Sequence, residues 1–534
     1  MTFGAGSRHV HAAHRHTATA LDTDLDAAAR TVVGGKGRAV AAMAGAGLPV
    51  PPAFCVTSEW CDGCAHDPAA VVERMWQDVL GGLTLLEERT GCTFGAGPRP
   101  LLLSVRSSGA TSMPGMLDTV LNVGIDDAVA EALGNRYSAR FADDTRERFR
   151  CGYRLAVPAG ADVPDEPLAQ LRGALEVVVS SWSSSRVTAY RAHHGLERGG
   201  IAILLQAMVF GNLDAGSGAG VLFTRDPASG ASNPFGEWLP AAQGDDVVSG
   251  TSDCEPLVAM RDRLPDAYEE LIDAGIRLER LGADVQDVEF TVEAGKLWLL
   301  QSRVAKRSPR AAVRLALAFR EEGVIDDVEV LDRVTPEQLA SVLEARSAPE
   351  QSGPPLATGV AASPGVASGL VCVTSDDAIA AADDGRDVVL VRPTTSPDDV
   401  AGLVAAKAVV TEVGGATSHA AIVARELGIP AVVGCGAGLT ALLAGRIVTV
   451  DGDAGEVRNG ESTPSESTDC PELLRFADIV RATSPLRAHA EGDYPVLDDA
   501  SEESVAAALA AGHTDVVSSE PLRTMHLAAR WARR

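Results

Sequence analysis

Short apolar runs alternate with helical patterns between residues 360 and 458. Five valine-rich runs are bounded by Gly, Pro or Asp, as β-strands usually are: GLVCVT, DVVLVRP, KAVVTE, PAVVG and RIVTVDG. Two segments between them, SPDDVAGLVAA and SHAAIVARELG, carry apolar residues at helical spacing. We expect the second helix to have Ser418 as its N-cap and Gly428 as its C-cap. The pattern predicts a compact α/β domain.

One histidine lies at the start of that second helix. His419 directly follows the loop GGATS and falls in the first helical turn. Free backbone N–H groups and the positive end of the helix dipole gather there, and both favour an anion. The hydroxyls of Thr417 and Ser418 add donors. His419 could therefore attack a phosphoryl group and hold it, or it could simply cap the turn. The glycine pair and the helix-start position favour the nucleophile.

Two segments of the N-terminal half offer cations for phosphate. Residues 31–60 read as a Gly-Gly-Lys-Gly loop, a helix and a Pro-rich exit into a strand, and Lys36 lies in the loop. Glycines let backbone N–H groups approach phosphate closely, although the spacing of a Walker A loop is absent. Arg106 lies at the end of the predicted strand LLLSVR. It could clamp a phosphate with two hydrogen bonds, or form a surface ion pair.

A predicted β-hairpin at 284–303 carries four further polar residues. Asp287 and Glu289 are two residues apart on the first strand, so both carboxylates face the same side. Gln301 and Arg303 repeat this spacing on the second strand, after an Ala-Gly turn. Paired carboxylates on one sheet face suit Mg²⁺ that bridges nucleotide phosphates. The alternative is an ordinary polar outer face of a sheet.

Composition and linker-like segments indicate the domain organisation. The chain has 534 residues, of which 46% are apolar and 4% aromatic, which suits α/β layers with Ala-lined helices. Pro, Ser and Gly gather in two aperiodic stretches. We therefore expect a disordered His-rich tail (1–20), a large domain (21–346), a linker (347–359), the α/β domain (360–458), a second linker (459–470) and a C-terminal segment (471–534).

Charge and cysteine content exclude several classes of partner. The formal net charge of −27 argues against binding to nucleic acid or to an anionic membrane. We see neither a run of about 18 apolar residues nor a signal peptide, so we expect a soluble, cytoplasmic protein. Cys61 and Cys64 form a C-x-x-C near His66, but a zinc site needs a second pair, so reduced thiols are expected.

Taken together, the motifs resemble those of the pyruvate phosphate dikinase family. The stretches that carry the resemblance are GGKGRAVAAM, SVRSSGATSMPGMLDTVLNVG, QAMVFGN, GVLFTRDPASG, GEWLPAAQGDDVVSG, QDVEFTVEAGKLWLLQSR, GVAASPGVASG and GGATSHAAIVARELGIPAVVG. They occur in family order from about residue 30 to residue 457. The resemblance implies an α/β multidomain protein with an ATP-grasp-like nucleotide-binding domain, a swivelling β/β/α phosphohistidine domain and a short remnant of a (β/α)₈ barrel.

The resemblance also assigns roles to individual residues. His419 matches the histidine that accepts the phosphoryl group, and Arg106, Gln301 and Arg303 match residues of the catalytic site. The implied nucleotide-binding set is Lys36, Arg106, Glu237, Asp287, Glu289, Gln301 and Arg303. Asp287 and Glu289 are the implied Mg²⁺ ligands. Thr417 matches a threonine that is a regulatory phosphorylation site in plant members of the family.

The implied reaction needs a part that this chain does not supply in full. In the family, ATP and inorganic phosphate phosphorylate the histidine and leave as AMP and pyrophosphate. The phosphohistidine then interconverts pyruvate and phosphoenolpyruvate on a (β/α)₈ barrel, which typically needs about 250 residues. Residues 471–534 resemble its first units, with Arg487 at the position of a phosphate-binding arginine. The next substrate arginine, expected around Ser518–Ser519, is missing.

Three functions therefore remain open. The chain could be an ATP-dependent phosphotransferase that delivers the phosphoryl group from His419 to a partner protein or a small acceptor. It could be a complete dikinase whose barrel is supplied by a partner chain or by a homodimer. It could also be a non-catalytic nucleotide-binding regulatory protein. The retained charged residues argue against the third function, because buried charges without partners are costly. A relationship to rifampin phosphotransferases ranks low, since no antibiotic-binding insert is present.

Overall fold

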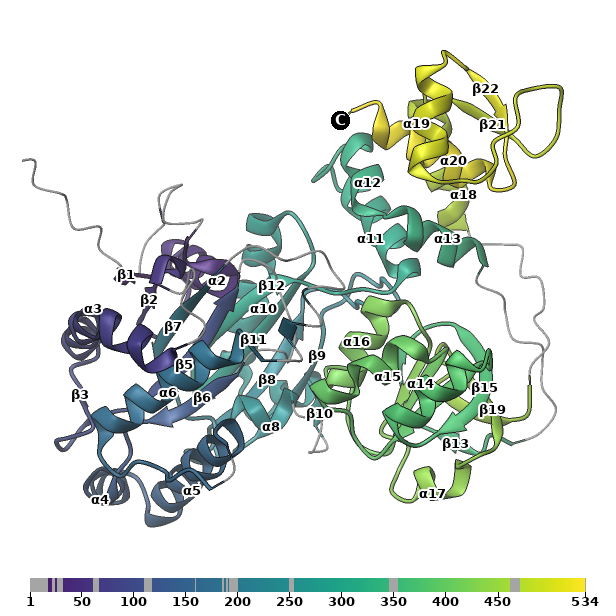
Figure 1. Cartoon of the computed structure of the whole chain (residues 1–534). Coiled ribbons are helices and arrows are strands. Elements are labelled where there is room, and N and C mark those ends of the chain that lie inside the picture. Colours follow the sequence, from purple (N-terminus) through teal and green to yellow (C-terminus); the bar gives the residue numbers. More distant parts are fainter. Residues whose placement is uncertain are drawn as a thin grey trace, which may run out of the picture. The chain divides into compact units, whose positions relative to one another are not determined.

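The computed structural model of the chain (Figure 1) describes most of its residues, namely 18–21, 25, 32–60, 67–109, 118–158, 160–184, 187–188, 191, 200–248, 254–344, 354–461 and 471–533. These residues form two compact units, Met1–Met208 and Val209–Arg534, which are described separately. The boundary falls inside the predicted domain 21–346. The four histidines of the N-terminal tail and the C-x-x-C with its neighbouring histidine lie outside the described residues.

The first unit is built on a five-stranded antiparallel sheet. Its strand order is β1-β2-β7-β5-β6, with β1 (Ala18–Ala20), β2 (Ala53–Val56), β5 (Leu103–Gly109), β6 (Thr119–Val123) and β7 (Ile201–Ala207). The first strand, β1, lies inside the segment that the sequence assigned to a disordered tail. Its backbone pairs with β2, so β1 is an edge strand of the sheet.

Helices cover both faces of this sheet. Consecutive residues of a strand point to opposite faces. Phe54 of β2 lies under Gly82 of α3 (Pro68–Thr90), whereas Cys55 lies close to Gly37 of α2 (Gly34–Gly45). Thus α2 lies on one face and α3 on the other, where α3 packs with α6 (Pro167–Ser181). Smaller elements complete the unit: η1 (Ser58–Trp60), β3 (Thr93–Phe94), β4 (Pro100–Leu101), α4 (Asp127–Arg136) and α5 (Ala139–Ala156).

The second unit begins with another five-stranded antiparallel sheet, the second-unit sheet. Its order is β10-β9-β8-β11-β12, with β8 (Gly218–Phe223), β9 (Phe235–Pro240), β10 (Glu255–Pro256), β11 (Gln286–Glu293) and β12 (Lys296–Val304). The predicted Ala-Gly hairpin is confirmed, because Ala294 and Gly295 join β11 to β12 with φ of 48° and 79°. Helices α8 (Gly244–Val248), α9 (Val258–Arg263) and α10 (Pro265–Gly282) flank the sheet.

Residues 354–461, here called the histidine domain, form an eight-stranded sheet with helices (Figure 1). Its order is β13-β20-β19-β15-β16-β17-β18-β14, with β13 (Ala357–Thr358), β14 (Val360–Ser363), β15 (Val366–Cys372), β16 (Val388–Arg392), β17 (Ala408–Thr411), β18 (Ala431–Val433), β19 (Ile447–Asp451) and β20 (Glu456–Asn459). All five strands predicted from the sequence are confirmed, as β15 to β19. Of the three further strands, β13, β14 and β20, the first lies inside the predicted linker 347–359.

The histidine domain has a separate core on each face of its sheet. Val409 of β17 packs among residues of α16 (His419–Leu427), and the next residue, Val410, packs against α17 (Leu439–Leu443). Both predicted helices are confirmed. The first is split into η2 (Pro397–Asp399) and α15 (Val400–Ala405), and α14 (Ser375–Asp383) lies beside them. As predicted, the C-cap of α16 is Gly428, in the left-handed conformation with φ of 69°.

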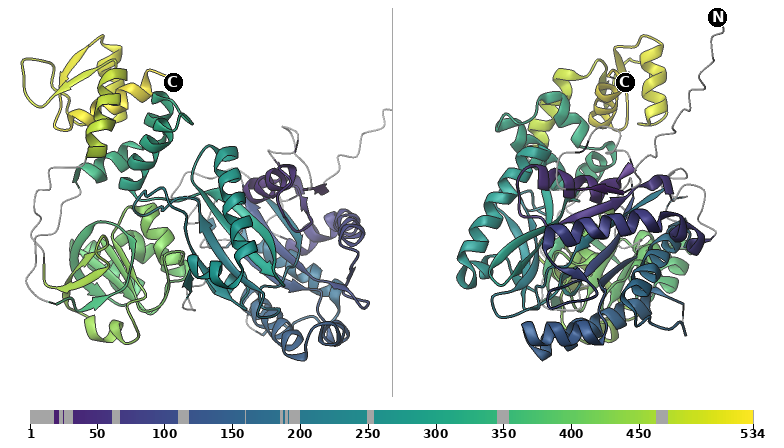
Figure 2. Two further views of the ribbon diagram at one scale, coloured as in Figure 1. Left: turned by 180° about the vertical axis from the view of Figure 1, so that it is seen from behind. Right: turned by 90° about the vertical axis from the view of Figure 1, so that its left-hand side faces the viewer.

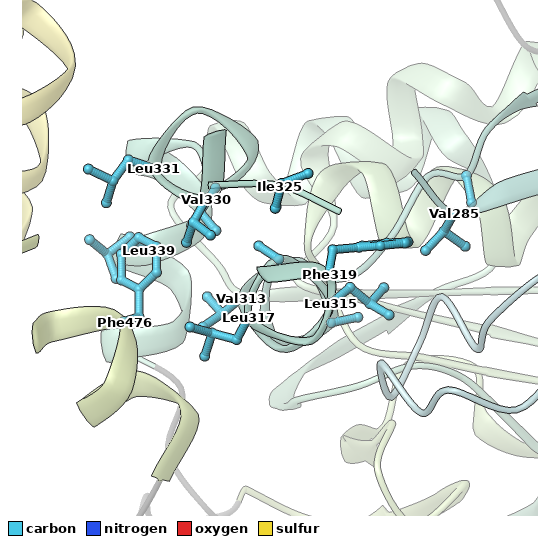
Figure 3. Close-up of a cluster of buried hydrophobic side chains, with 14 of the residues drawn as sticks. Val285, Val313, Leu315, Leu317, Phe319, Ile325, Val330, Leu331, Leu339 and Phe476 are labelled. Atoms are coloured by element: carbon cyan, nitrogen blue, oxygen red, sulfur yellow. The ribbon is translucent and has the colours of Figure 1, made fainter. Parts of the chain in front are cut away.

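The C-terminal segment packs on helices that precede the histidine domain. These are α11 (Pro309–Glu321), α12 (Asp327–Arg333) and α13 (Pro336–Glu344), and the segment comprises α18 (Pro471–Thr483), β21 (Arg487–His489), α19 (Glu502–Ala510), β22 (Asp515–Val517) and α20 (Pro521–Trp531). Seen from behind, the segment again lies beside α11–α13 (Figure 2). Phe476 of α18 is buried among side chains of the three helices (Figure 3). The two strands are parallel and joined through α19.

Within the described residues, no helix has both the length and the apolar character that crossing a membrane requires.

Candidate functional site

Five candidate residues share one face of the second-unit sheet. Residues directly opposite each other on neighbouring strands project from the same face. The register pairs Glu237 with Val221, Val221 with Glu289, and Glu289 with Gln301. It pairs Asp287 with Arg303 in the adjacent row, two residues along each strand. We call this the carboxylate face, formed by Glu237, Asp287, Glu289, Gln301 and Arg303. The sequence placed four of these residues on one hairpin face, and the sheet adds Glu237 from β9.

An ion pair ties the two strands of the hairpin together on this face. The Nε and Nη2 atoms of Arg303 both lie 2.8 Å from Oδ2 of Asp287. Burial raises the pKa of Asp287 above its ordinary range, while the neighbouring Arg303 opposes that rise. The Asp287 side chain is only 4% exposed, so its charge depends on this arginine for compensation. Asp287 is therefore a largely dry carboxyl group whose ionised form is supported by its contact with Arg303.

The loop that precedes His419 contacts the carboxylate face through Glu237. The carboxylate of Glu237 accepts hydrogen bonds from the backbone N–H of Ala416 at 2.6 Å and of Thr417 at 3.1 Å. It also accepts one from the Thr417 hydroxyl. Gly414, at the start of the loop, has a φ of 118°, which a residue with a side chain rarely adopts. The Thr417 hydroxyl, which the sequence suggested as a donor to an anion, thus donates its hydrogen bond to the carboxylate of Glu237.

His419 is presented with one ring nitrogen bound and the other unused. Its Nδ1 lies 3.2 Å from the hydroxyl of Thr395, which precedes η2. Its Nε2 is buried and has no hydrogen-bond partner among the described residues. Burial lowers the pKa of His419, although Asp399 nearby opposes the effect. The imidazole is therefore neutral at pH 7. If Nδ1 carries the proton and donates it to the Thr395 hydroxyl, the lone pair is on Nε2.

Ser418 is the N-cap of α16 by position only. Its hydroxyl makes no capping hydrogen bond, and its Oγ is buried without a partner in the described part of the chain. The carbonyl oxygen of Ser418 accepts the first helical bond, from the N–H of Ile422 at 3.0 Å. The sequence expected Ser418 to cap the helix, and the side chain does not. The first turn therefore keeps its N–H groups uncapped by Ser418, beside a buried hydroxyl and an unused imidazole nitrogen.

In the first unit, Lys36 and Arg106 belong to elements that pack together. Lys36 lies in the first turn of α2, and Arg106 lies on β5 two residues before Ser108. The Ser108 hydroxyl donates to the carbonyl of Val33 at 2.8 Å and accepts from the N–H of Gly37 at 3.1 Å. Because Arg106 and Ser108 project from the same face of β5, Arg106 lies on the face that α2 covers.

Thr395 provides a direct test of how the imidazole is held. Thr395→Val keeps the shape of this buried side chain but removes the hydroxyl that lies at Nδ1. We expect a roughly tenfold lower rate of phosphorylation at Nε2, because the ring loses its preferred tautomer and orientation. The half-saturating ATP concentration should not change. Rapid-quench measurement of the labelling rate checks this, with Thr394→Val as the matched control; equal rates in both variants would contradict the assignment.

Sequence reasoning missed two residues that the structure brings to this site. Thr395 carries no local signal, since its contact with His419 depends on the packing of α15 beside α16. Arg425 did carry a signal. It lies four residues after Ala421 on the apolar side of α16, and an arginine within a buried stripe is unusual. Its guanidinium is almost fully buried, with the residue 2% exposed.

The donors of the carboxylate face suit Mg²⁺ bound together with a nucleotide. Among the described residues, no group of three or more His, Cys, Asp or Glu side chains is arranged to hold a metal by itself. Asp287 and Glu289 offer two carboxylates on the same face of β11. Mg²⁺ is usually bound by one or two carboxylates, with substrate phosphates and water completing its shell. The pair therefore fits a nucleotide-bound Mg²⁺ rather than a metal held by protein ligands alone.

Two protein-family models match the chain. Residues 69–265 match the AMP/ATP-binding domain of pyruvate phosphate dikinase. Residues 385–455 match the mobile domain of PEP-utilising enzymes, and this range includes His419. The second match lies inside the histidine domain, and the first extends from α3 to the start of α10.

Curated relatives match most of this chain but only part of their own length. Pyruvate, phosphate dikinase of Rhizobium meliloti (strain 1021) is 37% identical over 536 residues, which cover 86% of this chain and 60% of that protein. Pyruvate, phosphate dikinase 2 of Zea mays is 37% identical, with 87% and 60% covered. The Clostridium symbiosum enzyme is 34% identical, with 83% and 58% covered. The chain thus spans about 60% of the length of these relatives.

A solved structure also matches a small part of the chain. The NMR structure of an Enzyme I protein (nEIt) is 38% identical over 17% of this chain and 37% of that chain, with a TM-score of 0.13. That TM-score is too low for a comparison of folds.

Proposed function

Since the chain belongs to the pyruvate phosphate dikinase family, we propose that it catalyses the ATP-dependent phosphorylation of His419. The coarse architecture agrees with this, as a mixed α/β protein with a nucleotide-binding domain of the family type and a PEP-utilising mobile domain. In this proposal Glu237, Asp287, Glu289, Gln301 and Arg303 contribute to the nucleotide site of the second unit. Lys36 and Arg106 are the proposed phosphate ligands of the first unit.

The observation that carries this proposal is the contact between Glu237 and the loop before His419. Three hydrogen bonds from Ala416 and Thr417 to Glu237 hold that loop on the carboxylate face. In this proposal the contact brings the acceptor histidine and the carboxylates of the nucleotide site together within the second unit.

The proposed step uses the neutral imidazole as the nucleophile. The Nε2 lone pair attacks the β-phosphorus of ATP, and the bond between that phosphorus and the oxygen of AMP breaks, so AMP leaves with the electron pair. The proton on Nδ1 stays on the ring, next to the hydroxyl of Thr395. Inorganic phosphate then takes the terminal phosphoryl group and leaves as pyrophosphate. Mg²⁺, when bound at Asp287 and Glu289, supplies positive charge that neutralises the phosphates.

The acceptor of the phosphoryl group is the least defined part of the proposal. We propose that the histidine domain moves to deliver the group to pyruvate bound on a barrel, or to another small acceptor. The parallel strands β21 and β22 with α19 between them are consistent with the opening units of such a barrel. A partner protein, or a second copy of this chain, would then complete the barrel. The nucleotide-binding part is proposed to be ATP-grasp-like.

The test is to incubate the purified protein with Mg²⁺ and ATP labelled at the β-phosphate, with and without inorganic phosphate. We expect acid-labile, base-stable label on the wild-type chain and none on His419→Ala. AMP should form, and pyrophosphate should appear only when inorganic phosphate is present. ATP that binds without labelling the protein under either condition would refute the proposal and favour a regulatory role.

A further inference from the structure

Arg425 is a buried cation on the same helix as His419. Its residue is 2% exposed, and its guanidinium donates to two backbone carbonyl groups. The Nη1 atom lies 2.9 Å from the carbonyl oxygen of Ala362 in β14, and Nη2 lies 2.9 Å from that of Ala416. Its Nε has no partner among the described residues. The side chain therefore joins the sheet of the histidine domain to the loop before His419.

The charge of Arg425 is compensated by carboxylates of the second-unit sheet and of the turn after β8. Within the described residues it forms no direct ion pair, and it lies 5.6 Å from the centre of the Phe223 ring of β8. Burial lowers the pKa of Arg425 to about 10, while Asp287, Asp226 and Glu237 oppose the decrease, so the guanidinium stays charged at neutral pH. A buried cation is costly without such compensation. Arg425 is thus stable in this position while the loop contacts the carboxylate face.

Arg425 and Glu237 hold the same peptide group from opposite ends. The carbonyl of Ala416 accepts from Arg425, and the N–H of Thr417, in the same planar unit, donates to Glu237. The N–H of Ala416, one peptide earlier, donates to Glu237 as well. Two oppositely charged side chains therefore fix the orientation of the peptide two residues before His419. Loss of either one frees the loop to rotate.

We propose that Arg425 is a positioning residue for phosphoryl transfer to His419, acting by fixing the peptide between Ala416 and Thr417 when the histidine domain lies on the carboxylate face. This inference rests on the proposed function. Arg425 touches neither the imidazole nor a substrate, so its contribution is to the geometry of the loop. Misplacement of a reacting group by about 1 Å is enough to slow a reaction by as much as 10²-fold. The effect should therefore fall on the rate at saturating ATP and not on ATP binding.

The experiment compares Arg425→Lys and Arg425→Met with Arg386→Met, whose parent arginine has a side chain that is 59% exposed. For each variant the initial labelling rate of His419 is measured against ATP concentration, and thermal melting is recorded. We expect Arg425→Met to label roughly tenfold more slowly at saturating ATP, with an unchanged half-saturating concentration. Arg425→Lys should recover part of the rate, since it keeps the charge and can donate to one carbonyl. Arg386→Met should match the wild type.

Two results would overturn the inference while leaving the proposed function intact. One is wild-type labelling in both Arg425 variants; the other is a loss that appears only as a higher half-saturating ATP concentration. If Arg425→Met proves unstable by melting, Arg425→Lys decides: a wild-type rate overturns the inference, and a reduced rate at unchanged half-saturation supports it. A wild-type chain that accepts no label would refute the proposed function itself, together with the role of Arg425.

Discussion

Replacing Gly415 with alanine should lower the rate of His419 labelling by about 10²-fold while the chain remains folded. A Cβ added at Gly415 would lie 1.9 Å from Oε1 and 2.5 Å from Cδ of Glu237. Atoms in ordinary contact lie much farther apart, so the loop would have to leave the carboxylate. Gly415 does not have a positive φ, so alanine fits its backbone conformation. The substitution should therefore weaken only the contact between the loop and the carboxylate face.

A matched glycine variant and a double variant test whether loss of this contact is what lowers the rate of His419 labelling. Gly244→Ala is the control, because a Cβ there would meet no atom within 4 Å. Glu237→Ala removes the carboxylate with which the new methyl group would clash. The double variant Gly415→Ala/Glu237→Ala should label no more slowly than Glu237→Ala alone, because contacting residues are not additive. Equal labelling of Gly415→Ala and the wild type would show that phosphorylation does not need this contact.

The local folds of the histidine domain and of the hairpin were predictable because their signals are local. Valine-rich runs between glycines and prolines gave β15 to β19, and the positive φ at Ala294 and Gly295 matches the hairpin turn expected from the sequence. The two-residue spacing on each strand was enough to place Asp287 with Glu289 and Gln301 with Arg303. Period-2 alternation needs no knowledge of tertiary structure.

The contacts that assemble the site were not predictable in the same way. Glu237 is 180 residues from Thr417 along the chain, and only the packing of the histidine domain brings them together. The family resemblance alone assigned Glu237 to the nucleotide site, and in the structure its carboxylate binds the loop before His419. Ser418 was expected to cap α16, but its hydroxyl is buried without a partner among the described residues. Non-local contacts of this kind leave no periodic trace in a sequence.

Arg225→Met should destabilise the second unit by about 2–3 kcal/mol, because it removes charge-assisted hydrogen bonds made by a buried guanidinium to two carboxylates that are only partly buried. The Arg225 side chain is 7% exposed and donates to Glu279 at 2.8 Å and to Glu322 at 2.7 Å. Its guanidinium also lies 4.2 Å from the centre of the Phe319 ring of α11. The network thus links the turn after β8 to α10 and α11. Methionine would fill part of the space but would leave two carboxylates facing each other.

Urea unfolding of the wild type and of Arg225→Met measures this loss in the free energy of unfolding. Arg320→Met is the control, since Arg320 pairs with Asp327 where both side chains are 42% exposed, and such surface pairs contribute less than about 1 kcal/mol. Similar losses in the two variants would show that the network around Arg225 does not stabilise the fold. A wild-type midpoint for Arg225→Met would show the same.

The pH dependence of stability gives the network a second, independent signature. The hydrogen bond from Arg225 lowers the pKa of Glu322, although burial opposes the effect. A carboxyl group whose pKa is lower in the folded state contributes stability above its unfolded pKa, about 4.3, and loses it as the pH falls through the folded value. The wild type should therefore lose part of its stability below about pH 4.

In Arg225→Met this acid-dependent part of the stability should shrink, because Glu322 then has a similar pKa in the folded and unfolded states. The difference between the two unfolding curves should accordingly be larger at pH 7 than at pH 3. An equal difference at both pH values would mean that Arg225 acts through packing on Phe319 and not through its charge.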